Sequence, residues 1–380
     1  MQRRSNRSRL GILGGGQLAR MCLAPATALA VDVTVLCRDF DDPAAKAWAD
    51  VMIGSPDDPD AVAAVAHRCE VVTFDHELVD TSIIRALEQR GYRFAPSAAV
   101  LTVAQSKVQQ RQQFDVLGLP IPPYVVLEAG TGASEISSFA ARHGWPLMLK
   151  ADRGGYDGRG VWRVNDLAVA ESIVTELHNR NTAVVLEEVM PLDIELAILV
   201  ARRWNGELAT YPLVETLQVD GMLRSLRAPA QVSQRLLRQA ADIAREIASA
   251  VEVVGLLAVE FFVSREGLLV NEIATRPHNS GHYTIEGAAT SQFEQHIRAV
   301  LDLPLGGTGL NAPHVATVNV IGAISPKGRA AALSVPGAHL HLYGKPPRPG
   351  RKLGHVTVTG DSREEVMRSA TFAALALEQE

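Results

Sequence analysis

The stretch Lys150-Ala-Asp-Arg-Gly-Gly-Tyr-Asp-Gly-Arg-Gly160 decides the fold that this sequence predicts. Lys150 ends an apolar run at 145–149, which predicts a strand, and the glycines begin four residues later. Glycines at 154, 155, 158 and 160 let backbone N–H groups turn inward around an anion, where larger side chains would block the approach. The stretch therefore predicts a phosphate-binding loop that follows a strand.

Carboxylates follow this loop within apolar segments. Glu187 and Glu188 close the next predicted strand, and Glu260 and Glu272 lie in two later ones, the second beside Asn271. A buried acid is costly among apolar neighbours unless it has a partner. Strand carboxylates are oxygen ligands for Mg²⁺, which bridges them to phosphates. These parts together predict a site for ATP with Mg²⁺, whereas an ordinary glycine-rich hairpin would explain the loop but not the carboxylates.

Size and composition limit the class of protein. A chain of 380 residues suits two or three domains, and a formal net charge of −5 argues against a nucleic-acid or membrane-surface binder. No run is long and apolar enough to cross a bilayer. Three cysteines fit a reducing compartment. Four arginines in the first nine residues lack the apolar segment of a secretory signal, so we expect a frayed terminus rather than a transit-peptide stub, and a cytoplasmic protein.

The N-terminal segment predicts the opening of a βαβ unit with parallel strands. A strand at 10–13 runs into a glycine turn, a helix follows at 17–30, and a second strand lies at 31–37. The turn resembles a dinucleotide fingerprint, which is weak evidence alone. Asp39 beside Arg38 would make a poor ribose pocket, so an NAD site is the weaker alternative.

A third predicted strand, at 71–74, ends at Asp75, His76 and Glu77. In open α/β sheets ligands collect at such carboxyl ends, so these side chains are candidates for a substrate crevice. A helix at 106–117 then ends at Gly118, and a proline-rich connector at 119–123 marks a domain boundary.

The remainder predicts a mixed α/β and α+β architecture with antiparallel strands. Strands are expected at 124–127, 162–164, 183–187, 195–200, 255–262, 268–273, 315–321, 339–343 and 355–358, and helices near 134–143, 233–251 and the C-terminus.

Two polar segments complete the candidate site. The turn 275–282, just past the strand of Glu272, concentrates Arg276, His278, Asn279 and Ser280. The proline-stiffened run 345–352 carries four cations, which suits a phosphate monoester better than a solubilising loop.

These motifs resemble the ATP-grasp superfamily and, more narrowly, the N5-carboxyaminoimidazole ribonucleotide synthetase family. The motifs lie at 14–18, 154–160, 271–272, 278–282 and 348–355, so the resemblance covers nearly the whole chain. It implies an N-terminal open parallel-sheet (Rossmann-like) domain at 1–118, a central ATP lid at 119–190 and a C-terminal ATP-grasp domain at 191–380. It also implies a homodimer, and a reaction in which ATP and bicarbonate form carboxyphosphate, which carboxylates the exocyclic amine of 5-aminoimidazole ribonucleotide.

The resemblance also implies a role for each matching residue. Lys107, which stands where some relatives have arginine, and Lys150 contact the ATP phosphates. The loop over them comprises Gly155, Tyr156, Asp157, Gly158, Arg159, Gly160 and Val161. Glu187, Glu188, Val189 and Met190 form the adenine hinge, Glu195 binds the ribose, and Asn271, with Gln218 more weakly, joins the nucleotide site. Glu260 and Glu272 hold magnesium. The residues around the ribonucleotide and the nascent carboxylate are Gln17, Leu18, Glu77, Tyr156, Asp157, Arg159, Arg276, His278, Asn279, Ser280, Lys345, Arg351 and Lys352.

Three other functions stay open at this point. A formate-dependent glycinamide ribonucleotide transformylase would keep the ATP residues but change the acceptor. A dehydrogenase would use the N-terminal glycine turn. A catalytically dead ATP-binding scaffold would need the loss of Lys150, Glu260 or Glu272, all of which are present.

Overall fold

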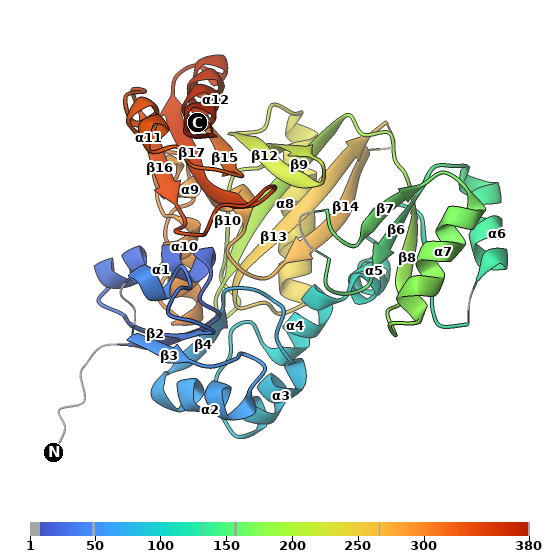
Figure 1. Ribbon diagram of the computed structural model, residues 1–380, viewed down its shortest axis with the longest axis horizontal. Helices are drawn as coiled ribbons and strands as arrows, with labels where there is room; N and C mark the ends of the chain where they lie inside the picture. Colours follow the sequence, from blue (N-terminus) through green and yellow to red (C-terminus); the bar gives the residue numbers. More distant parts are fainter. Residues whose placement is uncertain (1–7, 48–49, 131, 156–157, 266, 379–380) are drawn as a thin grey trace.

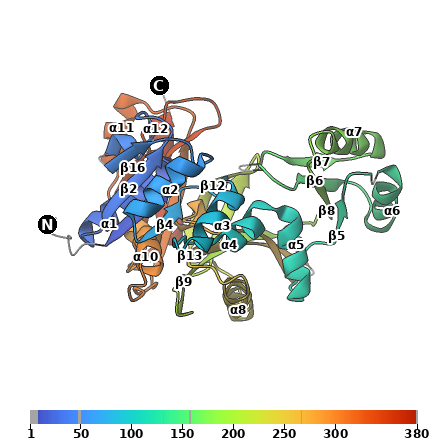
Figure 2. The same cartoon turned by 90° about the horizontal axis from the view of Figure 1, so that it is seen from below.

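The computed structural model describes residues 8–47, 50–130, 132–155, 158–265 and 267–378. Within these ranges the strands form three sheets, which we call the N-terminal, small and large sheets. The large sheet forms the middle of the molecule, and the small sheet with its two helices projects at the end away from the chain termini (Figure 1; Figure 2). None of the helices in these ranges has the length and apolar composition of a membrane span.

The N-terminal sheet is parallel, with strand order β3-β2-β1-β4. Its strands are β1 (Arg9–Leu13), β2 (Asp32–Cys37), β3 (Asp50–Ile53) and β4 (Val71–Phe74), and its helices are α1 (Gln17–Ala28), η1 (Ala45–Ala47), α2 (Pro59–Arg68), α3 (Thr81–Gln89) and α4 (Ala98–Gln105). Leu10 and Ile12 pack toward α1, whereas Val72 and Phe74 pack toward α2 and α3. Both faces are covered, which explains the apolar runs and confirms the expected open parallel sheet.

The small sheet is antiparallel, with strand order β5-β8-β6-β7. Its elements are β5 (Tyr124–Leu127), α6 (Ala133–His143), β6 (Leu147–Ala151), β7 (Val161–Val164), α7 (Leu167–His178) and β8 (Val184–Glu188). The two helices share one core with the sheet, in which Phe139 and Leu149 are buried. The other sheet face is therefore available to the site described below.

The large sheet has strand order β14-β13-β9-β11-β12-β15-β17-β16, with β10 beside β9. Its strands are β9 (Ile194–Arg202), β10 (Leu208–Thr210), β11 (Val214–Val219), β12 (Met222–Ala228), β13 (Gly255–Ser264), β14 (Gly267–Ala274), β15 (His314–Ile321), β16 (Ala338–Leu342) and β17 (Lys352–Gly360). Its helices are α8 (Gln234–Ala250), η2 (Asn279–Gly281), α9 (Thr284–Gly287), α10 (Gln292–Val300), α11 (Pro326–Leu333) and α12 (Arg363–Glu378).

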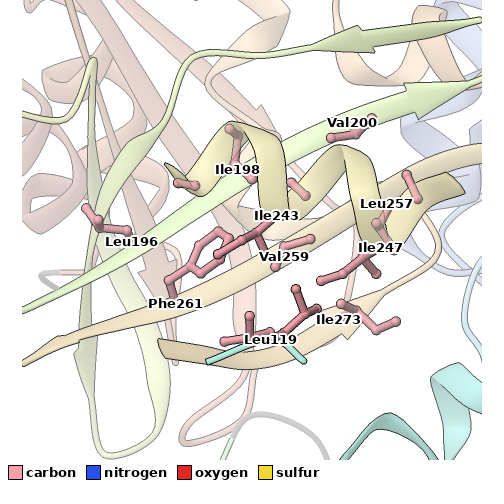
Figure 3. Close-up of a cluster of buried hydrophobic side chains, with 14 of the residues drawn as sticks. Leu119, Leu196, Ile198, Val200, Ile243, Ile247, Leu257, Val259, Phe261 and Ile273 are labelled. Carbon is pink, nitrogen blue, oxygen red and sulfur yellow. The ribbon is translucent and has the colours of Figure 1, made fainter. Parts of the chain in front are cut away.

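Helix α8 covers one end of this sheet. Ile243 and Ile247 pack against Val259 and Phe261 of β13, and Leu119 from the connector joins the same cluster (Figure 3). Full burial of each such side chain contributes about 1.5–3 kcal/mol. This core fixes β13 and β14, the strands that carry Glu260 and Glu272.

Helix α5 (Lys107–Val116) and the connector after it tie the small sheet to the large one. Ser106 caps the helix, its hydroxyl accepting from Gln109 N at 3.1 Å. The carbonyl oxygen of Pro120 accepts a hydrogen bond from Val270 N of β14 at 2.7 Å. The predicted connector is thus packed on the large sheet.

A buried histidine links the N-terminal sheet to the C-terminal half. His296 of α10 is 1% exposed, and its Nε2 lies 2.7 Å from the hydroxyl of Thr73 on β4. Burial lowers the pKa of His296 to about 4. The unfolded chain, with a histidine pKa of about 6.5, then binds this proton more readily than the folded protein does.

We therefore predict that His296 stabilises the fold fully above pH 6.5 and progressively less as the pH falls toward 4. His296→Gln, which keeps an amide for Thr73, should lose less unfolding free energy than wild type between pH 7.5 and 5.5. The slopes should differ by at most about 1.4 kcal/mol per pH unit. Urea unfolding at several pH values measures this difference, and equal slopes would contradict it.

Candidate active site

Buried charges join the small sheet to the large one. Glu187 of β8 is 2% exposed, and its two oxygens lie 2.6 Å from Lys150 Nζ and 2.7 Å from Arg111 of α5. Arg111 also donates to the carbonyl oxygen of Asn271 on β14 at 2.6 Å, and Lys150 donates to the Asn271 side-chain oxygen at 3.2 Å. Burial acts to raise the pKa of Glu187, but its two cationic neighbours outweigh burial and hold it below its usual value. Two cations against one carboxylate leave excess positive charge, which suits a polyphosphate.

The two predicted metal carboxylates lie side by side. Glu260 and Glu272 are directly opposite in the β13–β14 register. Lys107 Nζ lies 2.7 Å from Glu272, and His278 Nε2 lies 3.7 Å from Glu260. Burial and the adjacent Glu272 raise the pKa of Glu260 to about 8, whereas Lys107 lowers that of Glu272 to about 2.

These residues fit a divalent cation. A second charge on Glu260 is disfavoured beside Glu272, and a cation between them would remove that repulsion. In the described part of the chain, no group of three or more His, Cys, Asp or Glu side chains could hold a metal by itself. Phosphate oxygens and water would have to complete the coordination, as is usual for Mg²⁺.

The glycine loop lies between β6 and β7, and Val161, the first residue of β7, pairs with Lys150. Gly158 has φ of +76°, and a Cβ there would lie 3.0 Å from the carbonyl oxygen of Asp220. The loop thus rests on the turn between β11 and β12, two residues after Gln218. Gly154 and Gly160 also have positive φ, which explains the residue type. Tyr156 and Asp157 lie outside the described residues.

The predicted adenine hinge comprises the last two residues of β8 and the two residues after it. Glu188 is held by His143 Nδ1 of α6 at 2.8 Å, and Met190 is buried beyond it. Glu195 lies on β9, opposite Phe262 in the register, and its charge contributes to the raised pKa of Glu260. The predicted ribose carboxylate and the predicted metal carboxylates therefore belong to one region.

A second group of side chains gathers from the two ends of the chain. Gln17, at the start of α1, accepts a hydrogen bond from Lys345 Nζ, although 328 residues separate them. Glu77, just past β4, accepts from Arg276 Nε at 2.5 Å and from Thr275 N at 3.0 Å. The positive charges of Arg276 and Lys345 both act on Asp75 at the end of β4, which places the two pairs in one region.

The other predicted acceptor residues differ in their placement. Ser280 Oγ lies 2.9 Å from His278 Nδ1. Burial, with nearby Arg276 and Lys352, lowers the pKa of His278 to about 4. Leu18 is 7% exposed and belongs to the N-terminal core, so its side chain serves packing. Arg351 donates to the carbonyl oxygen of Pro346 at 3.2 Å, within its own segment.

The N-terminal glycine turn serves a protein carboxylate. Asp75 accepts a hydrogen bond from Ala19 N in the first turn of α1 at 2.8 Å. A Cβ at Gly16 would lie 2.0 Å from an oxygen of Asp75. This carboxylate covers the helix N-terminus where a dinucleotide phosphate would bind, which argues against the NAD alternative.

Sequence reasoning missed Arg111 and His143, which hold Glu187 and Glu188. Arg111 follows Lys107 by four residues on the same helix face, so the i,i+4 spacing could have indicated it. The sequence around His143 carries no comparable signal, because its partner lies 45 residues away on another element.

Comparison with known families divides the chain into three consecutive parts, of which the second spans the small sheet and strands β9 to β14 of the large sheet. Residues 7–105 match the ribonucleotide synthetase preATP-grasp domain, residues 112–293 match the ATP-grasp domain, and residues 316–369 match the phosphoribosylaminoimidazole carboxylase C-terminal domain.

Curated relatives and solved structures agree with this assignment. The N5-carboxyaminoimidazole ribonucleotide synthase of Mycobacterium tuberculosis H37Rv is 43% identical over 374 residues, covering 96% of this chain and 86% of that protein. The Thermus thermophilus synthetase structure matches with a TM-score of 0.88 and 37% identity, over 98% of this chain and 99% of that one. The Aspergillus clavatus enzyme in complex with ADP and 5-aminoimidazole ribonucleotide matches with a TM-score of 0.88 and 34% identity, over 98% of both chains. This chain belongs to the N5-carboxyaminoimidazole ribonucleotide synthase family of ATP-grasp ligases.

Proposed function

We propose that this chain transfers a carboxyl group from bicarbonate to the exocyclic amine of 5-aminoimidazole ribonucleotide. ATP would phosphorylate bicarbonate to carboxyphosphate, and attack by the amine would release phosphate and give the N5-carboxylated product and ADP. One observation carries the proposal: His278 of the acceptor turn approaches Glu260 to 3.7 Å. The acceptor group therefore adjoins the proposed ATP site, as direct transfer of a short-lived intermediate requires.

The residues proposed to bind ATP would neutralise the charge of its phosphates and hold them in place. Lys107 and Lys150 would bind phosphate oxygens, exchanging part of their contact with Glu272 and Glu187 for the nucleotide. Glu260 and Glu272 would hold Mg²⁺, which when bound neutralises phosphate charge. No protein nucleophile is needed, because the new bonds form between substrates.

The acceptor side would orient the ribonucleotide and exclude water. The pairs Gln17–Lys345 and Glu77–Arg276, drawn from three parts of the chain, would lie around the ribonucleotide. The loop at 155–161 would close over the phosphates and protect carboxyphosphate from hydrolysis. Tyr156, Asp157 and Arg159 are assigned to this closure by their match to the family motif.

We further propose domains at 1–118, 119–190 and 191–380, and a cytoplasmic homodimer. Each proposed domain contains one of the three sheets. Sedimentation equilibrium at micromolar concentration tests the dimer.

One assay tests the proposed reaction. Phosphate release from MgATP and bicarbonate should depend on 5-aminoimidazole ribonucleotide and should match the amount of carboxylated product. Stimulation by formate with glycinamide ribonucleotide, and not by bicarbonate, would favour the transformylase alternative.

Glu272→Gln should abolish most turnover while the protein stays folded, because it removes a proposed magnesium ligand and the partner of Lys107. Glu246→Gln, on the exposed side of α8, is the matched control and should behave as wild type. Steady-state phosphate release at saturating Mg²⁺ measures the effect. Near-native turnover of Glu272→Gln would remove this residue from the metal site.

Lys345→Met should raise the Michaelis constant for the ribonucleotide roughly ten- to a hundredfold, the range for loss of a hydrogen bond to a charged group. The constant for ATP should change little, since Lys345 contacts Gln17 at the start of α1. Lys327→Met, on exposed α11, serves as the control. A selective rise for ATP would show that the basic run serves the other substrate.

Arg111→Met should destabilise the fold by about 3–5 kcal/mol, because it leaves Glu187 buried with Lys150 as its single cationic partner among those described. It should also raise the Michaelis constant for ATP, since Lys150 loses its fixed position. The control is Arg363→Met, which breaks the remote Arg363–Glu215 pair and should cost stability alone. Urea unfolding and ATP titration separate the two effects, and unchanged ATP kinetics would assign Arg111 to folding only.

A further inference from the structure

A row of polar side chains crosses the C-terminal part of the large sheet. Asn319 of β15 lies opposite His355 of β17, which lies opposite His341 of β16. The other face of these strands packs its valines on α12. Asn319 is 1% and His355 is 0% exposed, so this polar row is an internal layer.

The acceptor turn and the helix after it lie on this row. Asn279 Oδ1 is 3.0 Å from Asn319 Nδ2, the rings of His282 and His355 are 4.8 Å apart, and Glu286 Oε1 is 2.6 Å from His341 Nε2. The spacing 279, 282, 286 is that of one helical face. Three successive contacts therefore seat the turn on the C-terminal strands.

In the hydrogen bond between Asn279 and Asn319, a neighbouring backbone carbonyl determines which side chain is the donor. Asn319 Nδ2 also donates to the carbonyl oxygen of Leu223 on β12 at 2.7 Å. A backbone carbonyl can only accept, so the amide of Asn319 must present its NH₂ group on this side. The atom of Asn279 that meets the same NH₂ group must then be its oxygen, and the NH₂ group of Asn279 points elsewhere.

The layer does not maximise stability. His282 Nε2, His355 Nε2 and Asn319 Oδ1 make no hydrogen bond with any described residue, although all three are buried. Unpartnered buried polar atoms are destabilising, and proteins keep them chiefly where function requires particular side chains. A row of apolar residues would pack the same strands.

We propose that Asn319 is a positioning residue that turns the amide of Asn279 so that its NH₂ group donates to an anionic oxygen of the substrates. This inference rests on the proposed function and on the assignment of Asn279 to the ribonucleotide by its family motif. The oxygen belongs either to the transferred carboxyl group or to the ribonucleotide phosphate. The C-terminal strands, which also carry Lys352 at the start of β17, would thus set the hydrogen-bonding direction of Asn279.

Asn279→Asp tests the direction. The new carboxylate keeps an oxygen toward Asn319 and places its second oxygen where the NH₂ group was. With wild type first shown to carboxylate the ribonucleotide, this variant should lose roughly ten- to a hundredfold in kcat/KM, as for a lost hydrogen bond to a charged group. A change of less than threefold would overturn the proposed direction. A rise in the Michaelis constant for bicarbonate, or for the ribonucleotide, identifies which substrate carries the oxygen.

A double-mutant cycle tests the path through Asn279. Asn319→Ser should reduce kcat/KM roughly three- to tenfold in wild type and leave it unchanged in an Asn279→Ala background, because the group it orients is gone. Equal losses in both backgrounds would show that Asn319 does not act through Asn279. Thr317→Val, which removes the hydroxyl bonded to Thr357 at 2.9 Å on the same face of β15, is the control for lost stability. Absence of carboxylation by the wild-type protein would contradict the proposed function itself, and the double-mutant cycle would then not be measured.

Discussion

Glu187 is a carboxylate with almost no exposed surface, held between Lys150 of its own sheet and Arg111 of helix α5. An unpaired charge at this depth would cost several kcal/mol, so β8, β6 and α5 must keep their relative positions for the fold to be stable. Arg111 extends the constraint to β14 through the carbonyl oxygen of Asn271. The small sheet is therefore attached to the large one at the point where the ATP phosphates are proposed to bind.

The same attachment sets the electrostatics of the proposed metal site. Asn271, which Arg111 and Lys150 both contact, immediately precedes Glu272, and the β13–β14 register then places Glu260 opposite. Lys107, one turn before Arg111 on α5, neutralises Glu272. Helix α5 thus carries a partner of buried Glu187 and a partner of Glu272, so the position of the small sheet and the charge balance of the proposed metal site depend on the same helix.

The sequence allowed local elements and motif residues to be predicted, because their signals are local. The strands at 71–74 and 124–127 have the expected bounds, since apolar runs end there at polar or proline residues. Contacts across the chain could not be predicted in this way. Gln17 and Lys345 meet over 328 residues, and nothing at either position specifies the other. The resemblance named both as acceptor residues without indicating that they touch.

Some side-chain positions could not be predicted from the sequence, because they depend on contacts between distant elements. The family motif at 14–18 named Leu18 together with Gln17, but successive residues of a helix point in different directions, and the Leu18 side chain lies in the N-terminal core. Asn319 carried no signal because an asparagine in a strand is unremarkable until its partners are known. Its proposed role depends on two hydrogen bonds, one to the Leu223 carbonyl on the neighbouring strand and one to Asn279 of the acceptor turn. In this fold the motifs supply the side chains proposed to bind the substrates, and residues without a motif, such as Asn319, contact those side chains from the sheet.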